Sequence, residues 1–165
     1  MINLDPNLEN CVCKSNHNPH ISCQNEYTLL EKGQALQLKP ANHREVVKLI
    51  PIDGCVINNS TTSKCDGLFL YQNSKNVIYS FLFELKNTEK WPKPVDQIDK
   101  VRNLDFYKDL IQSLNILRKN EKFVVVGSYI PTKIEKQKIE SIYGIRIISI
   151  IRQINAPYPD LKNYI

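Results

Sequence analysis

The sequence predicts a mixed α/β domain in which helices flank a central sheet. Two strand-like segments, residues 65–71 and 77–86, surround a polar turn at residues 72–76, which is typical of a hairpin. A long amphipathic segment follows the hairpin. Residues 123–126 then form a continuous apolar run, as expected of a strand buried on both faces. These segments share one chain of 165 residues, which favours a single main domain.

The segments upstream of the hairpin are less regular. Residues 1–25 are rich in Asn, Cys, His and Pro and lack apolar periodicity, so we expect an irregular N-terminal arm. Residues 26–32 predict a short helix that ends at a glycine. Residues 42–50 predict a second helix, because Asn42 and Glu45 have the spacing of a capping box.

The remaining segments complete the predicted order of elements. Residues 55–58 predict a short strand ahead of the hairpin. Apolar side chains at three- and four-residue spacing predict one long helix over residues 94–119. Residues 131–143 predict another helix with Gly144 as its C-terminal stop, and residues 145–151 predict a last strand. This order places helices on both sides of the sheet.

Composition narrows the class of protein. Hydrophobic residues make up 42% of the chain and charged residues 24%, as in globular domains. We place that domain at residues 26–155 and an irregular tail at residues 156–165. The chain has no apolar run of about 18 residues, as a membrane span requires. We also expect no secretory signal, because the first residues contain neither a basic region nor an apolar one. We therefore expect a cytoplasmic protein with reduced thiols. The net charge of +5 suits a polyanionic partner.

Charged side chains gather where the two predicted hairpin strands meet. Asp66 begins the first strand, and Glu84 and Lys86 end the second. Alternate residues of a strand share a face, so Glu84 and Lys86 point the same way, and hairpin pairing brings Asp66 beside Glu84. The preceding residues are strongly apolar, so these charges cost desolvation unless they are paired or bind a metal. Mg²⁺, which is held by one or two carboxylates with phosphate and water, would offset that cost.

This pattern resembles a known family. Asp66, followed after a hairpin by Glu84-Leu85-Lys86, resembles the PD-(D/E)XK motif of restriction-endonuclease-like nucleases. The predicted elements over residues 42–130 also resemble that family's αβββαβ core. The resemblance implies a Mg²⁺- or Mn²⁺-dependent endonuclease that hydrolyses phosphodiester bonds in nucleic acid, with DNA favoured. It implies that Asp66, Glu84 and the backbone carbonyl of Leu85 hold the metal. Lys86 would orient or deprotonate the attacking water.

The resemblance also implies two further catalytic residues. Family members often carry a glutamate upstream of the sheet, and Glu45 fits that position as a metal ligand, with Glu31 as the competing carboxylate. Many members have a glutamine or lysine on the following helix, which Gln97 matches. Helix capping alone would explain Glu45, and an exposed helix position alone would explain Gln97. Cys65 stands where the motif has proline, a position that varies within the family.

Basic residues follow the motif strand and are candidates for contacts with nucleic-acid phosphates. They are Lys90, Lys93, Lys100, Arg102 and Lys108. Trp91, the only tryptophan, could stack on a base or pack as a plug over the core. We favour the plug, because one aromatic side chain among lysines is thin support for stacking.

The N-terminal arm carries five side chains that could hold Zn²⁺. They are Cys11, Cys13, His17, His20 and Cys23. Their spacing matches no common zinc finger, in which two to four residues separate the first cysteines. We therefore favour a loose, reduced arm over a zinc site.

Three functions remain open from the sequence. The first is a nuclease in restriction, repair, recombination or defence, and a homodimer would supply one active site for each strand. The second is a catalytically inactive nuclease fold that binds nucleic acid or assembles a complex. The third is a zinc-dependent nucleic-acid binder built on the arm. The presence of all three core residue types favours the first.

Overall fold

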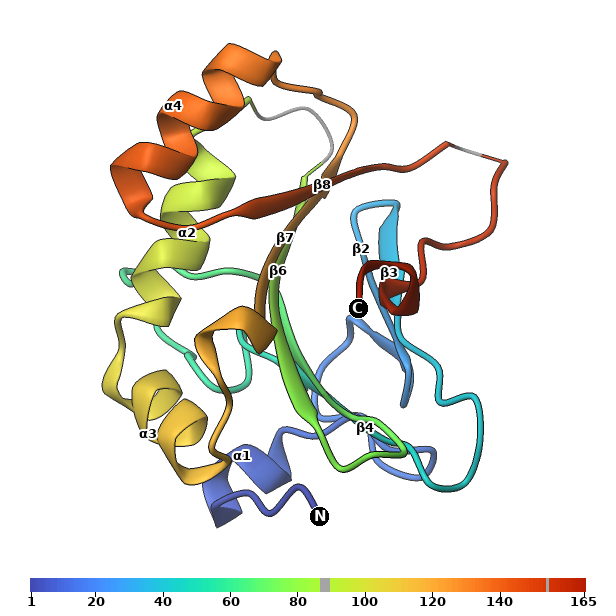
Figure 1. Cartoon of the computed structure of the whole chain (residues 1–165). Coiled ribbons are helices and arrows are strands. Elements are labelled where there is room, and N and C mark those ends of the chain that lie inside the picture. The colour runs from blue at the N-terminus through green and yellow to red at the C-terminus, as the bar shows by residue number, and fades with distance from the viewer. Residues whose placement is uncertain (87–89, 154) are drawn as a thin grey trace.

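A five-stranded mixed sheet forms the centre of the protein (Figure 1). The computed structural model describes residues 1–86, 90–153 and 155–165. The sheet has the order β4-β5-β6-β7-β8, with β4, β5 and β6 antiparallel and β6, β7 and β8 parallel. The strands are β4 (Val46–Pro51), β5 (Gly67–Gln72), β6 (Ile78–Lys86), β7 (Glu121–Gly127) and β8 (Ile147–Ile151). The predicted α/β class is confirmed.

Different layers cover the two faces of this sheet. The helices α2 (Lys93–Arg102), α3 (Asp105–Ser113) and α4 (Lys133–Tyr143) lie on one face (Figure 1). The antiparallel strands β1 (Cys23–Asn25), β2 (Thr28–Glu31) and β3 (Gln34–Gln37) cover the other. Two short 3₁₀ turns, η1 (Arg118–Asn120) and η2 (Leu161–Tyr164), complete the structure. The expectation that helices lie on both sides was wrong, because a small sheet takes the second face.

Alternation along β6 divides the hydrophobic core in two. Leu82 faces the helices and packs with Val95 and Ile98 of α2, whereas Phe81 and Phe83 face the small sheet. All five of these side chains are fully buried. Glu84 falls in the helix-facing series with Leu82, as expected for residues two apart in a strand. The alternation places the Glu84 carboxylate in a buried row that also contains Ser80 and Leu82.

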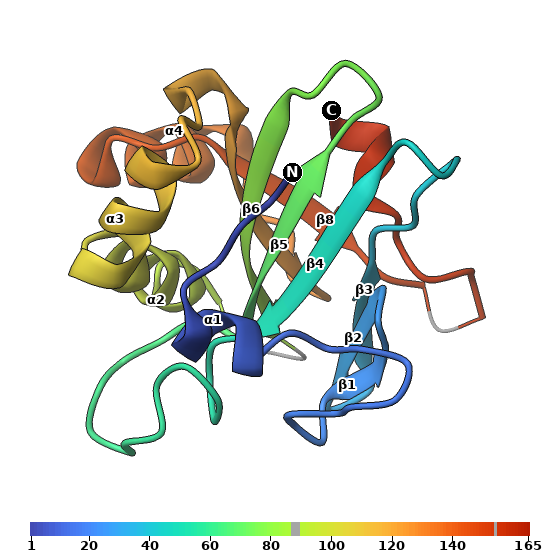
Figure 2. The same ribbon diagram turned by 90° about the horizontal axis from the view of Figure 1, so that it is seen from below.

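The N-terminal segment belongs to the folded body and is not a loose arm. It contains the helix α1 (Pro6–Asn10), which Asp5 caps by accepting hydrogen bonds from two backbone N–H groups. Ile2, Leu8 and Val12 are buried in the helix-side core. Figure 2 shows the segment beside β4, to which it is joined by backbone and side-chain contacts. Leu4, Leu8 and Val12 recur every four residues, as on one face of a helix, so a short signal for this packing lay among the polar residues of the segment.

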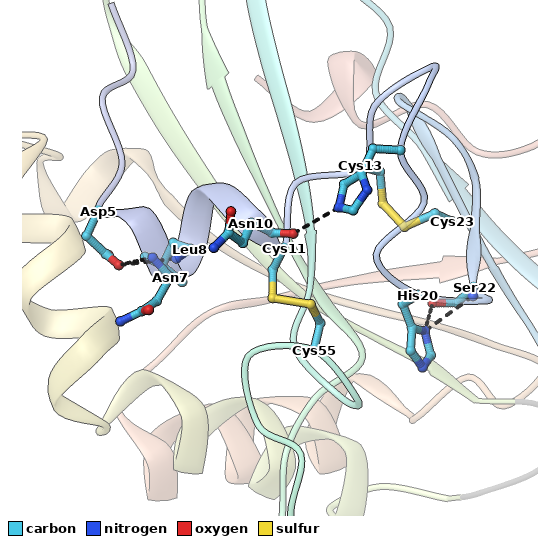
Figure 3. Close-up of a disulfide and its surroundings, with 11 residues drawn as sticks. Asp5, Asn7, Leu8, Asn10, Cys11, Cys13, His20, Ser22, Cys23 and Cys55 are labelled. Carbon is cyan, nitrogen blue, oxygen red and sulfur yellow. Dashed lines mark hydrogen bonds between the residues drawn. A yellow bond between two sulfur atoms is a disulfide. The ribbon is translucent and has the colours of Figure 1, made fainter.

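One disulfide ties the N-terminal segment to the rest of the domain, and a second lies within the segment (Figure 3). Cys11 is bonded to Cys55, and Cys13 is bonded to Cys23. Cys65 is a free, buried thiol. The expectation of reduced thiols was therefore wrong for four of the five cysteines. Among the residues described, no helix is long and apolar enough to cross a membrane.

Both helices predicted upstream of the hairpin are strands. Residues 26–32 contain β2, which pairs with β3 through a two-residue turn. Residues 42–50 contain β4, so the apparent capping box forms only a local turn, in which Asn42 accepts a hydrogen bond from the Arg44 backbone. Tertiary pairing with β5 decides the conformation here, because the β-branched residues of this segment suit a pleated surface.

Downstream elements follow the predicted order with one break. The single helix expected over residues 94–119 is divided into α2 and α3, because Leu104 between them is extended. Both pieces bury the same apolar stripe, which is why the periodicity continues across the break. The hairpin of β5 and β6, the strand β7 and the helix α4 are confirmed, and Gly144 closes α4 in the left-handed conformation. The short strand predicted over residues 55–58 does not form; Ile57 makes an isolated bridge with Asp53.

Candidate active site

The ends of β5 and β6 bring three charged residues together. Asp66 directly precedes β5, and Glu84 and Lys86 close β6. The Asp66 backbone N–H donates to Glu84 Oε2 at 3.0 Å, and the Leu85 backbone N–H donates to Asp66 Oδ2. Lys86 Nζ lies 2.7 Å from Glu84 Oε1. The predicted convergence of Asp66, Glu84 and Lys86 is therefore present in the structure.

Two glycines allow the close approach of strands at this site. A Cβ atom at Gly67 would lie 2.4 Å from the Phe83 ring, and one at Gly127 would lie 2.8 Å from the Lys86 carbonyl oxygen. Gly67 follows Asp66 directly, and Gly127 pairs with Lys86 across the parallel strands. A larger side chain at either position would displace the strand that carries a charged residue. These glycines therefore fix the position of the site.

Burial dominates the electrostatics of the two carboxyl groups. Glu84 is 0% exposed and Asp66 is 7% exposed. Burial raises the pKa of Glu84 from its ordinary 4.5 to about 7, although the hydrogen bond and charge of Lys86 act in the opposite direction. Burial, followed by the negative charge of Glu84, raises the pKa of Asp66 well above its usual range. One ammonium group, that of Lys86, cannot neutralise both buried carboxylates when both are ionised.

Glu31 is a third carboxyl group at this site. It ends β2 on the small sheet, and it hydrogen-bonds to Asp66, which contributes to the raised pKa of Asp66. Its negative charge also acts to raise the pKa of Glu84. Glu31 is paired with Lys32 at 3.3 Å. The sequence signal for its position was the turn at Lys32-Gly33, where both residues have positive φ, as in two-residue hairpin loops.

Glu45 lies away from this cluster, which corrects its predicted role. It precedes Val46, which pairs with Gln72 at one end of β5, whereas Asp66 precedes the other end. Glu45 Oε2 accepts a hydrogen bond from the Ala41 backbone at 2.7 Å and pairs with Lys162 at 2.6 Å. The predicted helix would have placed Glu45 over the sheet, but the strand that forms instead carries it to the far edge.

Gln97 approaches the site from α2. Its Nε2 donates to the backbone oxygen of Lys64 at 2.8 Å, two residues before Asp66. Its Oε1 is buried and has no hydrogen-bond partner among the residues described. A buried amide oxygen without a partner is costly in a folded protein. Gln97 thus holds the segment that leads to Asp66 and keeps one acceptor available.

The oxygen-rich donor set fits a hard divalent cation. Asp66 and Glu84 would hold it with the backbone carbonyl of Leu85, and Mg²⁺ commonly needs only one or two carboxylates because it retains water and phosphate ligands. Glu84 Oε1 is buried and faces only the Lys86 ammonium among its described neighbours. In the described part of the chain, no group of three or more His, Cys, Asp or Glu side chains is arranged to hold a metal ion. The fit therefore rests on two carboxylates.

The predicted basic residues divide into two groups. Lys90 lies 5.9 Å from the Tyr129 ring, just beyond the end of β7, and Lys93 begins α2. Both therefore lie at the edge where β6 ends. Trp91 is only 9% exposed and packs in the helix-side core. The plug interpretation of Trp91 thus agrees with its burial, and its ring is not presented for base stacking.

The other basic residues lie along α2 and α3. Lys100 pairs with Asp96 at 2.7 Å, and Arg102 pairs with Asp99 at 2.9 Å. Arg102 also donates to the backbone carbonyl of Tyr143, the last residue of α4, and its guanidinium lies over the Phe123 ring. Lys108 is exposed on α3. Arg102 and Lys108 are therefore remote from the carboxylates, at the end of the sheet where β7 begins.

The five candidate zinc ligands are not gathered into one site. Cys11, Cys13 and Cys23 are consumed in disulfides (Figure 3), so they present no thiolate to a metal. His17 Nε2 lies 3.3 Å from a backbone oxygen, and His20 Nδ1 lies 2.6 Å from a serine hydroxyl. The segment is held by covalent bonds and local hydrogen bonds in this state.

Comparison with family models, curated proteins and solved structures finds no match to this chain. The chemistry of the site must therefore be judged from its geometry. Two buried carboxyl groups can hold a cation, and the lysine beside them can orient a water molecule and place positive charge next to an anion.

Proposed function

We propose that the protein is a metal-dependent nuclease of the PD-(D/E)XK type that hydrolyses phosphodiester bonds in nucleic acid, with DNA as the favoured substrate. The convergence of Asp66, Glu84 and Lys86 at one strand end carries this proposal. Three antiparallel strands, a helical crossover and a parallel strand support it, since this order is that of the αβββαβ core. The helix predicted over residues 42–50, ahead of the hairpin, is replaced by β4, and β2 supplies Glu31 as the upstream carboxylate.

The residues have distinct tasks in the proposed reaction. Asp66, Glu84 and the Leu85 carbonyl would hold Mg²⁺ or Mn²⁺, which when bound supplies Lewis acidity and a more acidic water. Lys86, fixed by its 2.7 Å contact with Glu84, would orient the attacking water and stabilise negative charge on the phosphate. Glu31 would help to position Asp66. Burial strengthens each of these electrostatic interactions, because little water is present to screen them.

The raised pKa values support this assignment. Without a cation, burial holds the pKa of Glu84 near 7 and that of Asp66 above its usual range. A fold that keeps two such groups together loses stability when both are ionised. A divalent cation would remove that penalty, which is a physical reason for a metal to bind here. Strongly perturbed carboxyl groups are also typical of catalytic sites.

Plasmid and RNA degradation in Mg²⁺ or Mn²⁺ tests the proposal. We expect cleavage by the native protein and a loss of at least about 100-fold in Lys86→Ala, since the lysine acts on the reacting water. Lys75→Ala is the matched control, because it removes an exposed lysine in the turn between β5 and β6, at the end of the hairpin opposite to the carboxylates. Cleavage by Lys86→Ala at the native rate would overturn the proposed mechanism.

One observation favours the alternative of a catalytically inactive nuclease fold. Asp66, Glu84 and Lys86 already satisfy several of one another's hydrogen bonds without a cation. Such a network could serve as a buried structural ion pair. If the native protein binds DNA but leaves plasmid and RNA intact in every metal tried, the binding module is the correct assignment. A homodimer stays a prediction from the symmetry of duplex DNA.

A further inference from the structure

A second feature of the molecule is a basic groove far from the carboxylates. It has a volume of about 870 Å³ and lies where β7 and β8 begin. Five basic side chains line it, and we call this set the basic groove. They are Arg102, Arg118, Lys119, Lys122 and Arg146. Because β7 runs for seven residues to its pairing with Lys86, the groove lies roughly 20 Å from the proposed active site, at about 3.3 Å per residue.

The positive charge of the basic groove is only partly compensated, because Arg102 alone among the five forms an ion pair, with Asp99, among the residues described. Of the two acidic residues that line it, Glu140 accepts a hydrogen bond from the Ile147 backbone at 2.7 Å, and burial raises the pKa of Glu121. Within the described parts of the chain, neither Lys119 nor Arg146 has an ion-pair partner, and both are exposed. Unpaired cations that share one concave surface raise the local potential and attract anions.

We propose that the basic groove binds the phosphate backbone of a nucleic-acid strand, at a site separate from the proposed active site. Arginine forks match phosphate oxygens in two-point contacts, and three of the five basic residues are arginines. The volume exceeds what a single inorganic anion would fill. Tyr164, which is 38% exposed at the groove, offers a ring on which a base can stack.

The two sites can engage one strand. At about 3.4 Å per nucleotide, a separation of roughly 20 Å corresponds to about six nucleotides. Binding at the groove does not depend on cleavage, whereas a shared strand rests on the proposed nuclease function. The groove would hold the substrate by backbone contacts, which carry no sequence information of their own.

Fluorescence anisotropy with a labelled 20-nucleotide duplex or single strand in EDTA tests the groove alone. The test variant is Lys119→Glu/Arg146→Glu. The matched control is Lys39→Glu/Lys75→Glu, which changes the net charge equally at exposed lysines outside the groove. Losing two phosphate contacts should weaken duplex binding by about 50-fold at about 0.1 M salt and lower the salt slope by about 1.8. The control should lose far less.

Three results would overturn the proposal. They are an equal loss in both charge-reversed variants, no binding of either nucleic acid by the native protein, and binding of poly-glutamate with no binding of DNA or RNA. The last would assign the groove to an acidic protein partner. Lys119→Ala/Arg146→Ala serves if the charge-reversed variant does not fold. Binding is measured in EDTA, where a metal-dependent nuclease does not cleave, so failure of the nuclease proposal and failure of the groove are separable.

Discussion

In the metal-free protein, we expect the free energy of unfolding to fall as pH rises from 5 to 8. Burial gives Glu84 a pKa of about 7 in the folded state against an ordinary value of 4.5. Between these values the folded protein holds a proton that the unfolded chain has released, so stability decreases with rising pH. At about 1.4 kcal/mol per pKa unit, Glu84 alone contributes a loss on the order of 2 to 3 kcal/mol between pH 5 and 8. Asp66, whose pKa burial also raises, adds to the loss in the same direction.

Thermal unfolding in EDTA across this pH range measures the effect. A loss of this size corresponds to roughly 5–10 °C in Tm for a chain of this length. Glu84→Gln should flatten the dependence, because the amide does not titrate. Mg²⁺ should restore more stability at pH 8 than at pH 5, since a cation binds the ionised carboxylates. A Tm that is constant or rises between pH 5 and 8 in EDTA would refute the reasoning.

Three other outcomes follow from the same geometry. Glu31→Gln should slow cleavage by roughly tenfold or more, as loss of a residue that supports a metal ligand commonly does. The control variant Glu45→Gln should cleave at the native rate. Slower cleavage by Glu45→Gln than by Glu31→Gln would show that the wrong upstream carboxylate has been assigned. Gln97→Ala should lower the free energy of unfolding by about 1 kcal/mol and slow cleavage, and denaturant unfolding with single-turnover assays would detect either effect. Cys11→Ser/Cys55→Ser should lower the free energy of unfolding by about 4 kcal/mol, since this disulfide closes a loop of 44 residues, and an unchanged Tm would contradict the pairing.

The hairpin and its charged ends could be predicted from the sequence because their signals are local. Alternation in β6 separates Glu84 from Phe83, and a polar turn fixes the register that brings Asp66 to Glu84. The same is true of α4, where Gly144 adopts the positive φ of a C-terminal stop. Each of these features is decided within about twenty residues, where pattern and geometry agree.

Other features depend on contacts between segments that are distant in sequence, so local sequence patterns could not predict them. Asn42 and Glu45 have the spacing of a helix cap, but pairing with β5 makes a strand there. The bond between Cys11 and Cys55 spans 44 residues, and spacing alone cannot identify such partners. Glu31 approaches Asp66 only because a small sheet covers the second face of the central one.

The basic residues show the same limit. Lys93 and Arg102 both lie on α2, yet they reach opposite ends of the sheet because the helix runs back along β6. The predicted basic residues, although close in sequence, therefore do not form one surface. The basic groove also contains residues distant in sequence from α2, such as Arg118 in η1 and Arg146 directly before β8.

Calorimetric titration with Mn²⁺ at pH 8 tests most directly whether the buried carboxylates form a cation site. The account predicts one saturable site on the native chain and binding at least about tenfold weaker in Asp66→Asn. Circular dichroism of both proteins would establish that the variant is folded. Equal Mn²⁺ affinity in the two proteins, or no binding to the native chain, would contradict the account.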